Sequence, residues 1–217
     1  MKSLIFYLCL IVVTPVFAQK QAAYWYWANN RGVHFPNNGG DPEIVYDGKT
    51  FAQNESATAI SDSAGNLLFY ASADEGNLPI NQQVTIWNKH HNVMVNGTQI
   101  MGDNSAQQGL LVVPDPGNSQ RYYIFSIFGV TGAQNFPLSR SIWYSIVDMR
   151  LDGGLGEVVV KNQLVADSNS EGMTGTLHCN GRDYWVVTPT TQFKGKSVLS
   201  SISNIQLNKS DLRLSLN

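Results

Sequence analysis

Short β-prone runs, separated by turns rich in glycine, asparagine and aspartate, fill most of this chain. A strand–turn–strand pattern occurs three times, at residues 57–61, 62–66 and 67–70; at 109–113, 114–118 and 122–125; and at 175–179, 180–183 and 184–187. Each copy predicts a β-hairpin. The second runs begin 55 and then 62 residues apart, and a repeat of this size built only from strands and turns is typical of a propeller-like array.

Further strands are predicted outside the three hairpins. They lie at 24–27, 43–46, 84–88, 142–149 and 157–160, while 71–83 is predicted as a polar loop and 197–216 has only weak strand character. No segment keeps a helical period over a useful length, so little helix is expected. The expected fold is therefore all-β: an antiparallel repeat array, β-propeller-like and incomplete, with about three blades.

An array of three units raises the question of how its ends are covered. Propellers typically close with about four to eight blades, and an open array leaves an unpaired sheet edge. Two explanations are open: the chain is a fragment of a longer protein, or it packs differently, as a β-sandwich. We expect the fragment.

The N-terminus has the features of a secretory signal peptide. Lys2 gives a basic start, residues 4–13 are an unbroken apolar run, and Thr14 and Pro15 precede a small residue, Ala18. This predicts a signal peptide at 1–18 and a single domain at 19–217; the alternative is a buried N-terminal helix. The apolar run is too short to cross a hydrocarbon layer of about 30 Å, and no later stretch approaches that length. We therefore expect an exported protein without a membrane span.

Composition narrows the function classes. Hydrophobic residues make up 43% and charged residues 14% of the chain, and the net charge is −2. This fits a folded domain, and without a basic stripe nucleic-acid binding is not expected. Because Cys9 lies in the signal peptide, Cys179 would be the single cysteine of the mature chain. We expect it to be a buried, inert thiol in a strand rather than a nucleophile.

Several segments together resemble one family. They are 24–27 with 32–35, then 60–70, 84–88, 94–97, 122–125, 144–149, 151–156 and 178–185. In this order they resemble the N-terminal propeller-like region of large exported proteins from Bacteroidetes, over roughly residues 24–188. In that family the region is often followed by immunoglobulin-like or PKD-like repeats and a gliding-motility-associated C-terminal sorting domain for type IX secretion. The resemblance implies location and architecture, and it transfers no catalytic residue.

Metal binding has two sets of candidates. His90 and His91 are adjacent, and neighbouring residues of a strand point to opposite faces, so a solvated turn is favoured over zinc. Weak calcium candidates are the turn carboxylates Asp62, Asp115 and Asp152, with Asp183 in a similar position. The alternative is that each aspartate caps its own turn. No cofactor is expected.

No catalytic constellation is apparent. The carboxylates considered for glycoside hydrolysis are Asp62, Asp148, Glu157 and Glu171, and nothing in the sequence pairs them. No Gly-x-Ser-x-Gly motif is present, and the glycines at 153–156 join two strands, which predicts a hairpin turn rather than a phosphate site. Asp62-Ser63-Ala64 resembles the O-glycosylation acceptor of exported Bacteroidetes proteins.

The aromatic residues leave two hypotheses open. They are Tyr24, Trp25, Tyr26, Trp27, Trp87, Trp143, Tyr144 and Trp185. They could pack between blades or form a platform on which sugars stack. The expected function is an exported, cell-surface or secreted, non-catalytic module for adhesion, binding or scaffolding, with a surface glycan or protein as its partner. The alternative is a carbohydrate-binding protein or carbohydrate-active enzyme on the same scaffold.

Overall fold

The computed structural model describes residues 20–27, 29–50, 55–74, 83–128, 141–167, 171–194, 197–207 and 212–216. Within them the chain forms fifteen strands and two short 3-10 helices, and these residues contain no α-helix. The fold is therefore all-β, as predicted. The expected signal peptide at 1–18 lies outside the described residues.

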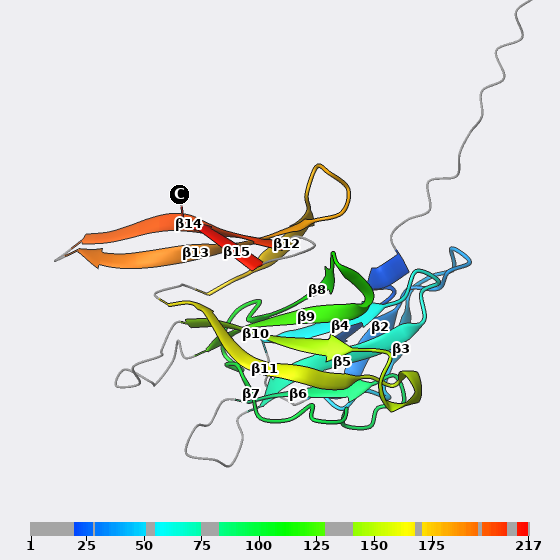
Figure 1. Cartoon of the computed structure of the whole chain (residues 1–217). Helices are drawn as coiled ribbons and strands as arrows, with labels where there is room; N and C mark the ends of the chain where they lie inside the picture. The colour runs from blue at the N-terminus through cyan, green and yellow to red at the C-terminus, as the bar shows by residue number, and fades with distance from the viewer. Residues whose placement is uncertain are drawn as a thin grey trace, which may run out of the picture.

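The strands form four open antiparallel sheets (Figure 1). The first contains β1 (Tyr24–Trp27), β2 (Arg31–His34) and β3 (Glu43–Val45). The second contains β4 (Ala57–Ser61), β5 (Leu67–Asp74), β6 (Gln83–Asn88) and β7 (Ile100–Met101). The third contains β8 (Leu110–Asp115), β9 (Asn118–Phe128), β10 (Ser141–Asp148) and β11 (Glu157–Ala166). The fourth contains β12 (Thr174–Leu177), β13 (Tyr184–Lys194), β14 (Ser197–Leu207) and β15 (Leu212–Leu216). The 3-10 helices are η1 (Lys20–Ala22) and η2 (Asp152–Gly154).

Within each sheet the strands follow one another in chain order, as in a meander. The first strands of consecutive sheets also lie next to one another: β1 beside β4, β4 beside β8, and β8 beside β12. Figure 1 shows the fourth sheet, in orange and red, set above the others, with β12 at the side that faces β8. The sheets therefore meet along their first strands.

Each pair of consecutive sheets encloses its own hydrophobic cluster. Tyr26, Leu67, Tyr70 and Trp87 fill the space between the first and second sheets. Between the second and third sheets the cluster is aliphatic and larger, and it includes Ile60, Phe69, Ile86, Ile124, Val147 and Val158. Between the third and fourth it includes Phe125, Ile127, Ile142, Met173 and Val186. Burial of one such side chain stabilises the fold by about 1.5–3 kcal/mol. Since these side chains are buried between sheets, packing between sheets holds the domain together.

The three repeated hairpins predicted from the sequence are present as β4–β5, β8–β9 and β12–β13. Glycine at the turn is required in two of them, since Gly65 and Gly181 have φ of +88° and +71°, a region that disfavours side chains. In both turns the glycine N–H donates to the backbone carbonyl three residues earlier, Asp62 or His178. The local turn signal in the sequence therefore corresponds to a specific backbone requirement.

Three details differ from the predictions. The segment 71–74 continues β5 instead of forming a loop, because its small side chains Ala71, Ser72 and Ala73 are completely buried between neighbouring strands. The region 197–216, predicted as weak strand, forms the two paired strands β14 and β15. The described residues form four sheets, where the sequence suggested about three repeat units, because β1–β3 form a sheet of their own.

Candidate functional site

The turns of the three repeated hairpins line one cleft of about 760 Å³. They contribute, in chain order, Ser61, Asp62 and Ser63; Pro114, Asp115 and Pro116; and Gly181 and Arg182. The rest of the wall is formed by Gln21, Leu68, Ser119, Gln120, Tyr122, Met149 and Tyr184. Residues that are more than 50 positions apart meet here because β4, β8 and β12 are neighbours and each ends at the cleft.

The aspartates of these turns hydrogen-bond within their own turns. Asp62 Oδ1 accepts the backbone N–H groups of Ala64 and Asn66, at 2.8 and 2.9 Å. Asp115 Oδ1 accepts the N–H of Gly117 at 2.7 Å. Although partial burial opposes it, the hydrogen bonds from Asn66, Ala64 and Gly65 lower the pKa of Asp62. These carboxylates therefore shape the rim of the cleft by fixing its turns.

In the third turn Asn180 Oδ1 accepts the backbone N–H groups of Arg182 and Asp183, each at 3.0 Å, and the Asp183 carboxylate binds side chains. It accepts hydrogen bonds from Asn180 Nδ2 at 2.7 Å and from Arg182 Nε at 2.8 Å. The Arg182 side chain, followed by Asn180, lowers the pKa of Asp183. Arg182 contributes the guanidinium of the cleft lining and is already paired with this carboxylate.

Hydroxyl groups supply the available polar chemistry inside the cleft. The Ser61 side chain is completely buried, and its Oγ has no hydrogen-bond partner within the described residues. Burial raises the pKa of both Tyr122 and Tyr184, so both phenols stay protonated at neutral pH. A buried hydroxyl without a partner is costly, but Ser61 lies beneath the cleft surface, so the half-buried Tyr122 and Tyr184 present the hydroxyls that a ligand can reach.

The cleft continues into a second, more apolar hollow of about 340 Å³ between β4, β8 and β12. Gln21, Pro114 and Tyr184 line both spaces. The second hollow adds Ile60, Leu111, Val112, Val113, Gly175, Thr176 and Leu177. A polar mouth above an apolar wall is the usual composition of a ligand site.

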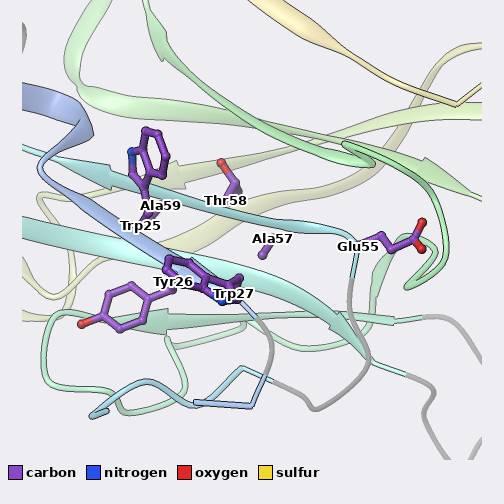
Figure 2. Close-up of a pocket in the computed structure, with 7 residues that line it drawn as sticks. All are labelled: Trp25, Tyr26, Trp27, Glu55, Ala57, Thr58 and Ala59. Carbon is purple, nitrogen blue, oxygen red and sulfur yellow. The ribbon is translucent and has the colours of Figure 1, made fainter. Parts of the chain in front are cut away.

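A separate groove of about 360 Å³ lies between β1 and β4, the terminal strands of two sheets. Its lining is Trp25, Tyr26, Trp27, Glu55, Ala57, Thr58 and Ala59. Figure 2 shows the Trp25 indole and the Thr58 hydroxyl on the same side of the two strands, with the Glu55 carboxylate farther along. The exposed fraction differs sharply from one residue of β1 to the next: Trp25 and Trp27 are 56% and 41% exposed, whereas Tyr26 is 4% exposed.

The eight aromatic residues considered in the sequence thus divide between the two hypotheses. Tyr26, Trp87 and Trp143 are buried, as expected for packing between sheets. Trp25 and Trp27 are exposed and line the groove. The remaining three, Tyr24, Tyr144 and Trp185, are half-buried.

The two adjacent histidines have different surroundings. His90 is exposed in the turn after β6. His91 is half-buried, with Nδ1 3.2 Å from the Tyr70 hydroxyl and Nε2 3.4 Å from Asp47 Oδ2. Asp47 Oδ1 also accepts a hydrogen bond from the Tyr26 hydroxyl at 3.0 Å. His91 therefore belongs to a polar network at the edge of the first sheet interface, which the sequence prediction of a solvated turn missed.

Metal ligands do not gather in the described ranges, where no three His, Cys, Asp or Glu side chains lie close enough to hold an ion. Of the calcium candidates, Asp62 and Asp115 line the cleft, while Asp152 is exposed in η2 between β10 and β11. The predicted hairpin turn at 153–156 does join these two antiparallel strands.

The structure brings together two of the four carboxylates considered for hydrolysis. Asp148 and Glu157 are directly opposite in the β10–β11 ladder. Asp148 is only 3% exposed and binds Arg150 and Arg121, with Nε–O distances of 2.9 Å from each. Arg150, with Arg121, holds the pKa of Asp148 well below its usual range despite burial. Glu171 lies elsewhere, where its Oε2 accepts the N–H of Gln107 at 3.3 Å.

Cys179 is exposed, so the prediction of a buried thiol in a strand was wrong. The reason is that β12 ends at Leu177, which places Cys179 in the following turn. Its Sγ lies 3.6 Å from Nδ1 of His178. Ser63, in the segment that resembles an O-glycosylation acceptor, is likewise exposed at its turn.

Among the described residues, a cleft rimmed by the repeated turns, the apolar hollow beside it and a groove lined by two exposed indoles are thus candidate sites. In the described part of the chain no helix has the length and apolar character needed to cross a membrane. The chain matches no family model, no curated protein and no solved structure.

Proposed function

We propose that this protein is an exported, non-catalytic, β-propeller-like module that binds a cell-surface partner through the cleft formed by its repeated turns. Export rests on the signal-peptide pattern of residues 1–18. The partner is a surface glycan or protein. The observation that carries the proposal is the convergence of three sequence repeats on one hydroxyl-lined cleft.

The propeller-like arrangement is supported by the order of the sheets. In a propeller, meandering sheets follow one another around an axis, with their first strands innermost. Here β1, β4, β8 and β12 lie side by side in that order, and a separate hydrophobic cluster fills each space between consecutive sheets.

A binding role is supported by the chemistry of the cleft. The rim aspartates are occupied by their own turns, which favours a rigid rim over a proton-transfer role. Tyr122 and Tyr184, which are half-buried, offer neutral hydroxyls next to apolar surface. This combination suits a polar, uncharged ligand group such as a sugar or a peptide amide, held by hydrogen bonds and apolar contact.

The experiment is a binding and turnover assay with the chain 19–217. Immobilised neutral glycans, mucin, collagen and fibronectin serve as the panel, and binding is followed by surface plasmon resonance. A cleft-blocking pair, Ser63→Arg with Ser119→Arg, changes two exposed residues at the rim. The matched control, Val159→Arg with Leu164→Arg, places the same charge on β11, outside the cleft lining.

We expect the wild type to bind at least one panel member, the blocking pair to weaken that binding about tenfold or more, and the control pair to leave it unchanged. Equal binding by wild type and blocking pair would contradict a role for the cleft. Release of products from any polymer in the panel would contradict a non-catalytic module and favour the carbohydrate-active alternative.

A further inference from the structure

The groove between β1 and β4 has a different character from the cleft. Trp25 and Trp27 lie at alternate positions of β1, so both indoles project from the same face of the strand. Their Cα atoms are about 6.6 Å apart, given the rise of an extended chain. Tyr26 projects to the opposite face, where its ring stacks on Tyr70 with the centroids 4.4 Å apart.

The exposure of these two indoles is unusual within this molecule. The other tryptophans are Trp87 and Trp143, which are buried, and Trp185, which is half-buried. Large aromatic side chains that stay open to solvent beside a hollow mark a contact surface more often than a packing defect. Trp25 is also held in place from one side, because the Phe35 ring meets it edge-on at 5.2 Å.

We propose that this groove binds a neutral glycan chain, with adjacent sugar rings stacked on Trp25 and Trp27. The C–H faces of sugar rings are apolar and flat enough to cover an indole, and the Cα spacing of about 6.6 Å between alternate residues of a strand is comparable to the distance between neighbouring sugar rings. This site is distinct from the turn cleft and does not depend on it: β4 runs between them, with Glu55 and Ala57 near the groove and Ser61 at the cleft.

Polar groups beside the indoles fit sugar hydroxyls. The Glu55 carboxylate and the Thr58 hydroxyl line the groove, and neither side chain has a hydrogen-bond partner within the described residues. A carboxylate accepts hydrogen bonds only, whereas the Thr58 hydroxyl donates and accepts. Sugar hydroxyls can match both groups. The described lining residues include no lysine, arginine or histidine, so among them an anionic glycan would meet Glu55 without a compensating charge.

A proline-rich peptide is the other ligand that commonly docks on exposed aromatic rings. It matches this groove less well, since proline has no N–H to donate to Glu55. The glycan satisfies both the apolar and the polar part of the lining, so it is the favoured occupant.

The test is a titration of the chain 19–217, followed by tryptophan fluorescence. The probes are cellohexaose, laminarihexaose, mannohexaose and chitohexaose, with decaproline as the peptide competitor. We expect a saturable change with at least one hexasaccharide. Trp25→Ala and Trp27→Ala should each weaken that binding about tenfold or more, and Trp27→Phe, which keeps a ring, should stay within about threefold of wild type. Glu55→Gln should weaken it by a smaller factor.

Controls separate this site from the cleft and from misfolding. Tyr46→Ala removes an aromatic ring that is 70% exposed and outside the groove, and it should leave binding unchanged. Circular dichroism confirms the fold of each variant, and Trp27→Ala decides the outcome if the loss of the Trp25–Phe35 contact unfolds Trp25→Ala. The proposal is overturned if no hexasaccharide binds, if both alanine variants bind like wild type, or if decaproline binds instead. Loss of hexasaccharide binding in the Ser63→Arg and Ser119→Arg pair, with both tryptophan variants unaffected, would assign the glycan to the cleft and also overturn it.

Discussion

The interface between the second and third sheets and the one between the first and second are built from different chemistry. The former is a large, mostly aliphatic cluster, in which Phe69, Ile86 and Ile124 are completely buried. The latter is a small stack of aromatic rings, Tyr26, Tyr70 and Trp87, with ring centroids 4.4 and 5.4 Å apart. Equivalent positions in a repeated architecture can therefore be filled either by aliphatic side chains or by stacked aromatic rings.

Two carboxylates that lie beside these clusters also differ in burial. Asp148, at the end of β10, is 3% exposed and is bound by two arginines. Asp47, beside the aromatic stack, is 54% exposed and contacts Tyr26 and His91. Since a hydrogen bond to a buried charge contributes more than an exposed ion pair, Asp148 should contribute more to the stability of the domain than Asp47.

The largest expected effect comes from Phe69→Ala. This change removes a completely buried ring from the aliphatic cluster, and the lost burial and the cavity together should lower the free energy of unfolding by about 3–5 kcal/mol. Urea denaturation followed by fluorescence measures it. A loss below about 1 kcal/mol would show that the second and third sheets do not depend on this cluster.

Asp148→Asn should have the next largest effect. It removes the charge that binds Arg121 and Arg150, and we expect a loss of about 2 kcal/mol in the free energy of unfolding at pH 7. Because the pKa of Asp148 is lowered in the folded state, its stabilisation is present above the ordinary carboxyl pKa of about 4 and is lost as the pH falls below it. The difference between wild type and variant should therefore shrink on acidification. A difference that is constant from pH 7 to pH 3 would contradict this assignment.

Tyr70→Phe tests the aromatic interface. It should lower the free energy of unfolding by about 1 kcal/mol at pH 7, since it removes the hydroxyl next to His91 and keeps the ring.

Burial raises the pKa of Tyr70 and of Tyr26. The stabilisation linked to a raised pKa is complete below the ordinary tyrosine value of about 10 and is lost as the pH rises above it. Wild type should thus be destabilised more steeply above pH 10 than a variant in which both tyrosines are phenylalanine. An equal loss of stability in wild type and in the double variant above pH 10 would contradict this prediction.

The smallest expected effect is that of Asp47→Ala. Its carboxylate is more than half exposed, so removing its contacts with Tyr26 and His91 should cost less than about 1 kcal/mol. Thermal melting of this variant beside Asp148→Asn compares Asp47 and Asp148 directly. An Asp47 effect equal to or larger than that of Asp148 would reverse the expected ranking of the two carboxylates.

The sequence predicted the hairpins well because their signals are local. Turns such as 62–66 and 180–183 carry the glycine that the backbone requires and a side chain that caps the turn, Asp62 in the first and Asn180 in the second. The strand at 197–207 was underestimated, because its serine and asparagine residues give little hydrophobic alternation, whereas backbone pairing with β13 does not depend on such a pattern. The extension of β5 through 71–74 was not predicted, because its small residues give no strand pattern in the sequence and are buried only by the neighbouring strands.

The candidate sites were less predictable. The four aromatic residues of β1 show no contrast between a polar and an apolar face, so the exposure of Trp25 and Trp27 became visible only from the packing of Tyr26 on Tyr70. The turn aspartates were identified as candidates, but their shared cleft depends on the side-by-side placement of β4, β8 and β12. That placement is a long-range property, which no local pattern encodes.

The most direct test of the proposed binding cleft is whether the three repeated turns meet in solution. Cys179, which is exposed in the third turn, can be spin-labelled in the chain 19–217 and paired with a second label at Ser63→Cys or Ser119→Cys, in the first and second hairpins. Pulsed electron paramagnetic resonance then measures the two distances. A shared cleft predicts a single short distance for each pair, well below the roughly 40 Å diameter of a compact domain of this size. Distances near that diameter, or a broad distribution, would contradict the convergence of the turns and with it the binding cleft.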